Sequence, residues 1–144
     1  LTFCRHPRTG KTPAMCAILN LPMSKGRKGR YTTIDDLVAD IKGTYSKDAG
    51  VTERDVVALY TDVDFLALDE IGRMAKTDHT MKVLQGIIDK RYRKNKPTLI
   101  GTNIQKGALE GILGEAAFGR LREGGGKIAS MNWPSLRIDE NIIR

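Results

Sequence analysis

The chain has 144 residues, a length that fits one domain, because globular domains usually have roughly 100–200 residues. Lys and Arg outnumber Asp and Glu by 24 to 17, and the resulting net charge of +7 favours a polyanionic partner such as nucleic acid. No apolar run approaches the roughly 20 residues of a membrane span, and the two cysteines lack the spacing of a disulfide framework or a zinc site, so we expect a cytoplasmic protein.

Short apolar segments alternate with longer segments of helical periodicity, a pattern typical of parallel sheets with crossover helices. The expected strands are 1–4, 30–33, 65–69, 98–102 and 127–131. Residues 65–68 are apolar without alternation, as in a strand covered by helices on both faces. The sequence therefore predicts an α/β fold in three α/β/α layers around a five-stranded parallel sheet. Because the chain opens inside a strand without Met, we expect it to be a piece of a longer protein.

Three helices are expected between the later strands. Thr33 with Asp36, and Thr52 with Asp55, have the spacing of capping boxes, and the longest helix is expected over 77–94. Apolar side chains recur at helical spacing in the first two helices, namely Leu37, Ile41 and Tyr45, and Val56, Leu59 and Tyr60. In the longest helix Met81, Leu84, Ile88 and Tyr92 lie on one face, which is expected to pack in the core.

The segment after the first strand ends in Gly10-Lys11-Thr12, the close of a Walker A phosphate loop that opens a helix. In such loops backbone N–H groups surround the phosphates, the Lys reaches the β- and γ-phosphates and the hydroxyl ligates Mg²⁺. We expect ATP to be bound here by Pro7, Thr9, Gly10, Lys11 and Thr12.

A second motif supports this interpretation. The buried strand at 65–69 ends in Asp69 and Glu70, the Walker B pattern, in which Asp69 holds hydrated Mg²⁺ and Glu70 polarises the attacking water. The strand at 98–102 is followed by Asn103, which occupies a sensor 1 position and is expected to orient that water. Carboxyl ends of parallel strands share one sheet edge, so these residues are predicted to surround one magnesium-bound triphosphate.

The order of these motifs resembles that of DnaC-type helicase loaders of the AAA+ class of P-loop ATPases. The resemblance also includes Asp89-Lys90-Arg91-Tyr92, Gly114-Glu115, Gly119-Arg120-Leu121, Asn132-Trp133 and Arg137, and so spans nearly the whole chain. The transposon helper ATPases of the same subclade are similar, less closely.

The resemblance implies roles for two arginines. Arg120 would be an arginine finger that reaches a neighbouring subunit's nucleotide, which requires a homo-oligomer, and Arg137 would be the sensor 2 arginine. It also implies a spiral assembly on single-stranded DNA that loads a replicative helicase, with the helicase held by an N-terminal domain absent from this chain. Residues 1–144 would then be the AAA+ core alone, with no helical lid after Arg137.

The phosphate loop departs from the family pattern in three places. Arg5 and Arg8 stand where the family has glycine, and Pro13 offers no N–H to the phosphates. One interpretation is that the arginine charges compensate and ATP still binds, with reduced activity. The other is a non-catalytic scaffold for DNA or helicase that has lost its nucleotide site. A dinucleotide-binding Rossmann domain is a weaker alternative, because no GxGxxG follows the first strand.

Two basic clusters are candidates for nucleic-acid contact: Lys25, Arg27, Lys28 and Arg30 in one, and Lys90, Arg91, Arg93, Lys94 and Lys96 in the other. The second equally fits a helix C-terminus, where cations complement the dipole. The loader resemblance places single-stranded DNA along a helix at 35–47, with Lys42, Tyr45 and Lys47 as contacts and Tyr45 available for base stacking.

Overall fold

The structure is a computed structural model that describes residues 1–4, 9–46, 48, 50–72, 77–123 and 126–131. Within these residues, the helices and strands follow one another in the order β1-α1-β2-α2-α3-β3-α4-β4-α5-α6-β5. The strands are β1 (Thr2–Cys4), β2 (Gly29–Thr33), β3 (Phe65–Ile71), β4 (Thr98–Thr102) and β5 (Ile128–Ser130). The helices are α1 (Lys11–Met23), α2 (Ile34–Gly43), α3 (Glu53–Thr61), α4 (Asp78–Arg93), α5 (Lys106–Leu113) and α6 (Glu115–Arg122).

The strands form one sheet in the order β2-β3-β4-β1-β5, and every neighbouring pair is parallel. The predicted α/β fold with a parallel sheet is therefore confirmed. Because β1 lies between β4 and β5, the chain leaves β1 through α1 and crosses β4 and β3 to reach the far edge at β2. Such a reversal of strand order opens a crevice beyond the carboxyl ends of the strands, where α/β proteins bind ligands.

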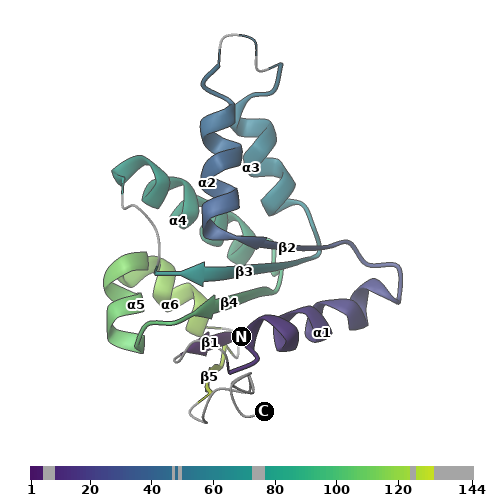
Figure 1. Cartoon of the computed structure of the whole chain (residues 1–144), viewed down its shortest axis with the longest axis vertical. Coiled ribbons are helices and arrows are strands. Elements are labelled where there is room, and N and C mark those ends of the chain that lie inside the picture. Colours follow the sequence, from purple (N-terminus) through teal and green to yellow (C-terminus); the bar gives the residue numbers. More distant parts are fainter. Residues whose placement is uncertain (5–8, 47, 49, 73–76, 124–125, 132–144) are drawn as a thin grey trace, which may run out of the picture.

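Helices cover the two faces of the sheet unequally. Figure 1 shows α1 by itself at the lower right, with α2 and α3 at the top and α5 and α6 at the opposite side from α1. The main core lies under the five later helices and includes Leu66 and Leu68 of β3, whereas Ala67 packs with Met15 and Leu19 of α1 in a smaller core. This alternation along a uniformly apolar strand confirms that β3 is covered on both faces.

Both expected capping boxes are present. The Thr33 hydroxyl accepts a hydrogen bond from the backbone N–H of Asp36 at the start of α2, and Thr52 does the same for Asp55 at the start of α3. In each pair the carboxylate accepts the backbone N–H of the threonine in return, which satisfies two otherwise unpaired donors at the helix N-terminus.

The expected core position of Tyr92 is wrong, and two apolar side chains of the preceding segments are also exposed. Helix α2 ends at Gly43, so Tyr45 lies beyond it and is 60% exposed. Leu59 and Tyr92 are also exposed, and the inner face of α4 carries Ile87 and Arg91 instead of Tyr92. The sequence pattern predicts which side of a helix is apolar. It does not predict how much of that side the neighbouring elements cover.

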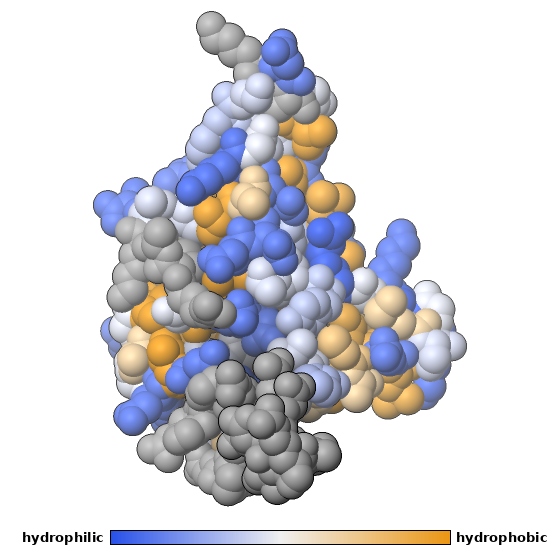
Figure 2. All heavy atoms as spheres, in the orientation of Figure 1, coloured by the Kyte–Doolittle hydropathy of each residue, from blue (hydrophilic) through white to orange (hydrophobic). Residues whose placement is uncertain are grey.

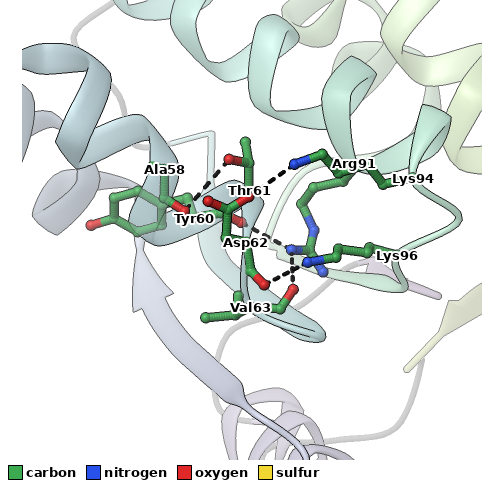
Figure 3. A network of polar contacts seen from close by, with 8 residues as sticks. All are labelled: Ala58, Tyr60, Thr61, Asp62, Val63, Arg91, Lys94 and Lys96. Atoms are coloured by element: carbon green, nitrogen blue, oxygen red, sulfur yellow. Dashed lines mark hydrogen bonds and ion pairs between the residues drawn. The ribbon is translucent and has the colours of Figure 1, made fainter.

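Arg91 differs more strongly from expectation, because the sequence groups it with a basic cluster that is a candidate for nucleic-acid contact, and its side chain is fully buried. Its guanidinium has five N–H groups, and each finds an acceptor: Thr98 Oγ1 at 3.0 Å and the carbonyls of Tyr60 at 2.9 Å, Val63 at 2.8 Å, Asp64 at 3.2 Å and Pro97 at 2.7 Å. Figure 3 shows this side chain directed from α4 into the turn after α3. Arg91 therefore joins the two loops that lead into β3 and β4, and it is not available to nucleic acid.

The surface is mixed, with apolar side chains concentrated on the outer end of α1. Ile18, Leu21 and Met23 are 39%, 64% and 44% exposed. Figure 2 shows an orange area at the lower right, where α1 lies in the same orientation in Figure 1. No helix among the described residues is long and apolar enough to cross a membrane.

Candidate functional site

The first feature of the site is the start of α1. Gly10 caps this helix with a φ of 84°, in the left-handed region that favours glycine, and Lys11 is its first residue. The first backbone bond of the helix runs from the N–H of Ala14 to the carbonyl of Gly10 at 3.0 Å. Pro13 therefore stands where no N–H is needed for the helix, which is why the helix tolerates it. Thr9 and Lys11 are both buried.

A helix that begins after such a loop presents the backbone N–H groups of its first turn and the positive end of its dipole, an arrangement that attracts phosphate. The altered positions Arg5 and Arg8, and the predicted ATP-binding residue Pro7, lie outside the described residues. The described part of the loop retains the glycine, lysine and threonine of the motif.

The second feature is a contact between α1 and β3. The Thr12 hydroxyl donates a hydrogen bond of 2.6 Å to Oδ2 of Asp69, whose residue is only 2% exposed. These two groups come from motifs far apart in the sequence, and the crossing of α1 over the sheet brings them together. Mg²⁺ prefers oxygen ligands, keeps several waters and usually takes only one or two side chains plus substrate phosphates. The hydroxyl and the carboxylate have the chemistry of such a partial ligand set.

Within the described residues, no three His, Cys, Asp or Glu side chains gather closely enough to hold a metal by themselves. A magnesium ion at this edge would accordingly depend on phosphate oxygens for the rest of its coordination, which is how Mg²⁺ binds in nucleotide sites.

Asp69 has further partners that the sequence did not indicate. The Tyr31 hydroxyl donates to the same Oδ2 at 3.0 Å, and the backbone N–H of Glu70 donates to Oδ1 at 2.8 Å. On the other side lies Gly101 of β4, where an added Cβ would stand 2.1 Å from Oδ1. Burial and the neighbouring Asp69 carboxylate raise the pKa of Tyr31 to about 12, so its hydroxyl stays protonated as a donor at neutral pH.

Glu70 sits in an unusual backbone conformation. Its φ of 61° is one of two positive values among the described residues other than glycine, and the register between β3 and β4 shifts between Leu68 and Ile71. The strand thus continues to Ile71, two residues beyond its predicted end, with an irregularity at Glu70 that turns its side chain out of the regular alternation. Backbone strain of this kind is held in place by surrounding structure and often occurs at functional sites.

Asn103 is the first residue after β4 and is exposed. Since Thr102 pairs with Ile71, Asn103 follows β4 directly beside the end of β3. Its predicted role remains a prediction.

Arg120 lies elsewhere. Its guanidinium forms an ion pair of 2.7 Å with Asp89, eleven residues along α4 from the first residue of that helix. At 1.5 Å per residue, Asp89 lies roughly 16 Å from the start of α4. This helix follows β3 and runs away from the carboxyl edge of the sheet. Arg120 therefore pairs at a point of α4 that is far along the helix from the end of β3, where Asp69 lies. Arg137 lies outside the described residues.

The predicted DNA contacts are only partly described. Lys42 is exposed near the end of α2, and the Tyr45 ring lies 6.2 Å from that of His79, while Lys47 lies outside the described residues. Figure 1 shows α2 and α3 projecting together from the rest of the molecule, with the segment that joins them at the tip. The helix expected over 35–47 is present as α2 but ends at Gly43, so Tyr45 is presented by the turn after the helix.

The strand order and the phosphate loop before α1 define the class: the chain has the fold of AAA+ P-loop proteins. The crystal structure of the DnaC helicase loader matches with a TM-score of 0.75 and 27% identity over 90% of this chain and 76% of that one. DnaA from Aquifex aeolicus, bound to AMPPCP, matches with a TM-score of 0.76 at 21% identity, over 90% of this chain and 39% of that one, and supports the fold.

The family follows from the sequence comparison. The model of the IstB-like ATP binding proteins matches residues 3–120, and the chain belongs to this family. It is 29% identical over 135 residues to the replicative helicase loader DnaC of Escherichia coli, over 94% of this chain and 55% of that protein. The same identity and coverage hold for the DnaC loader of Buchnera aphidicola. The chain thus spans about half the length of these curated relatives.

Proposed function

We propose that residues 1–144 are the ATPase core of a helicase loader, which binds and hydrolyses ATP while it places a replicative helicase on single-stranded DNA. The observation that carries this proposal is the 2.6 Å hydrogen bond between Thr12 and Asp69, which joins the two halves of a nucleotide site. Membership of an ATP-binding family and the similarity to DnaC loaders support it. The helicase would be held by a segment that this chain does not contain.

In the proposed mechanism, the start of α1 and the buried Lys11 bind the phosphates. Thr12 and Asp69 would hold Mg²⁺, which would supply neutralisation of the phosphate charge. Glu70 accepts a proton from the attacking water, and Asn103 orients that water. Chemistry of this type depends on positioning and electrostatics more than on covalent steps.

Arg120 would complete the site of a neighbouring subunit, because in its own chain it pairs with Asp89 of α4 instead of contacting the Thr12–Asp69 pair. Arg137 would act as the sensor 2 arginine. The active form would accordingly be a homo-oligomer, in which a spiral of cores follows single-stranded DNA through the projecting α2 and its neighbours Lys42, Tyr45 and Lys47.

The first prediction tests this function directly. Lys11→Ala removes a charge-assisted hydrogen bond worth about 1.5–3 kcal/mol, so it should weaken binding of a fluorescent ATP analogue by roughly 10- to 100-fold. Phosphate release should be stimulated by single-stranded DNA in the unchanged chain and lost in this variant. Lys42→Ala, outside the nucleotide site, should retain ATP affinity and reduce the DNA stimulation.

A non-catalytic scaffold is the competing function, and it is favoured by Arg5, Arg8 and the missing N–H of Pro13. A variant with glycine at positions 5 and 8 separates the two. Undetectable ATP binding by the unchanged chain, with binding restored by the two glycines, would favour the scaffold. A transposition helper of the same family would also bind ATP, but would not stimulate helicase loading.

A further inference from the structure

Residues of the two strands that flank β3, namely β2 and β4, restrict the carboxylate of Asp69. On β2, Tyr31 pairs with Ala67, and it therefore lies diagonally from Asp69 on the same face of the sheet, within reach of an aromatic side chain. On β4, Gly101 is the neighbour that leaves space for Oδ1. The two contacts act on opposite oxygens of one carboxylate.

The Tyr31 hydroxyl and the Thr12 hydroxyl donate to the same oxygen, at 3.0 Å and 2.6 Å. Oδ1 is held by the Glu70 N–H at 2.8 Å. A carboxylate with three donors and 2% exposure has little freedom to rotate. Without the tyrosine hydroxyl, Oδ2 would be held toward the helix by Thr12 alone, which is also the residue expected to turn toward the metal.

We propose that Tyr31 is a positioning residue that keeps Oδ2 of Asp69 directed toward Thr12, so that hydroxyl and carboxylate are already aligned for the Mg²⁺ of a bound nucleotide. This inference rests on the proposed nucleotide function and deepens it by adding a residue from β2 to the site. Hydrogen-bond partners behind metal ligands orient those ligands, and their loss typically lowers metal affinity by about 10- to 100-fold. The tyrosine ring packs in the smaller core, and phenylalanine would keep that packing.

The test is Tyr31→Phe, with binding of a fluorescent ATP analogue measured as Mg²⁺ is titrated. The Mg²⁺ concentration for half-maximal enhancement of binding should rise about tenfold. Binding in EDTA should stay unchanged, because the phosphate contacts of Lys11 and the helix do not involve Tyr31. Thermal unfolding of the nucleotide-free protein shows whether the variant is folded.

Tyr60→Phe is the matched control. Tyr60 is buried and also donates its hydroxyl to a carboxylate, that of Asp40, but it lies in the main core on the other face of the sheet. This variant removes the same kind of hydrogen bond and should leave the Mg²⁺ dependence unchanged.

A half-maximal Mg²⁺ concentration in Tyr31→Phe within twofold of the unchanged chain would overturn the assignment. Equal weakening with Mg²⁺ and with EDTA would also overturn it, since that result describes a structural residue. If ATP binding by the unchanged chain does not respond to Mg²⁺ at all, the proposed function fails too. A response that is retained in Tyr31→Phe defeats only the role of the tyrosine.

Discussion

Arg91→Met tests how much the buried guanidinium contributes to stability. Methionine retains most of the aliphatic stem and removes all five donors, leaving Thr98 and four carbonyls without this partner. The bond to the Tyr60 carbonyl is buried, and an unsatisfied buried acceptor costs about 1–3 kcal/mol. The remaining acceptors are partly exposed and can regain water, so each should cost only about 0.5 kcal/mol.

Burial lowers the pKa of Arg91 to about 10, which means that the protein bears a desolvation cost for this charge and that its removal returns part of the loss. We therefore expect a net decrease of about 3 kcal/mol in the free energy of unfolding. With a urea m-value of about 2 kcal/mol/M, the unfolding midpoint should fall by roughly 1.5 M.

The assay is urea unfolding followed by circular dichroism. Arg93→Met is the matched control, because Arg93 lies two residues further on the same helix with a side chain 68% exposed and pairs only at the surface with Asp89. It should change stability by less than about 0.5 kcal/mol. A loss below about 1 kcal/mol for Arg91→Met would refute the reasoning, since the carbonyls would then be satisfied without the guanidinium.

Two further predictions concern a glycine of the sheet and two tyrosines. Gly101→Ala should lower the free energy of unfolding by about 1–3 kcal/mol and weaken Mg²⁺-dependent ATP binding, because the added Cβ would displace the Asp69 carboxylate. Gly86→Ala in α4 is the control: an added Cβ there has no neighbouring atom within 4 Å, so this change should raise the free energy of unfolding by up to about 1 kcal/mol in the same urea assay. Folding raises the pKa of Tyr31 and Tyr60 from 10 to about 12, so their contribution to stability should be complete below pH 10 and lost as the pH rises from 10 to 12. Urea midpoints at pH 9 and 11 measure this loss, and a decrease that is no smaller in the double phenylalanine variant would contradict it.

Much of the architecture follows from local sequence signals. The capping boxes at Thr33 and Thr52 involve residues three positions apart. The uniformly apolar run of β3 indicates a strand that is covered by helices on both faces. The phosphate-loop residues and the paired acids are contiguous motifs, so they could be recognised before any contact was known. Signals of this kind are carried by neighbours in the chain, whose geometry the backbone fixes.

Other features depend on which strands become neighbours. Tyr31 is an ordinary strand residue in the sequence, and Gly101 an ordinary glycine; both acquire a role only because β2 and β4 flank β3. The alternation of side chains along a strand assigns Tyr31 to one face of β2. It does not identify Asp69 as its partner, because that depends on the register between β2 and β3. The irregularity at Glu70 likewise depends on how β3 pairs with β4.

The sequence by itself determined the α/β class, the capped helices and the pairing of a phosphate loop with two acids, because each is encoded within a few adjacent residues. Tertiary structure alone decided that Arg91 is buried, that Tyr45 is exposed and that Tyr31 reaches Asp69. The reason is that periodicity describes one element at a time, whereas burial and hydrogen-bond partners depend on the elements packed against it.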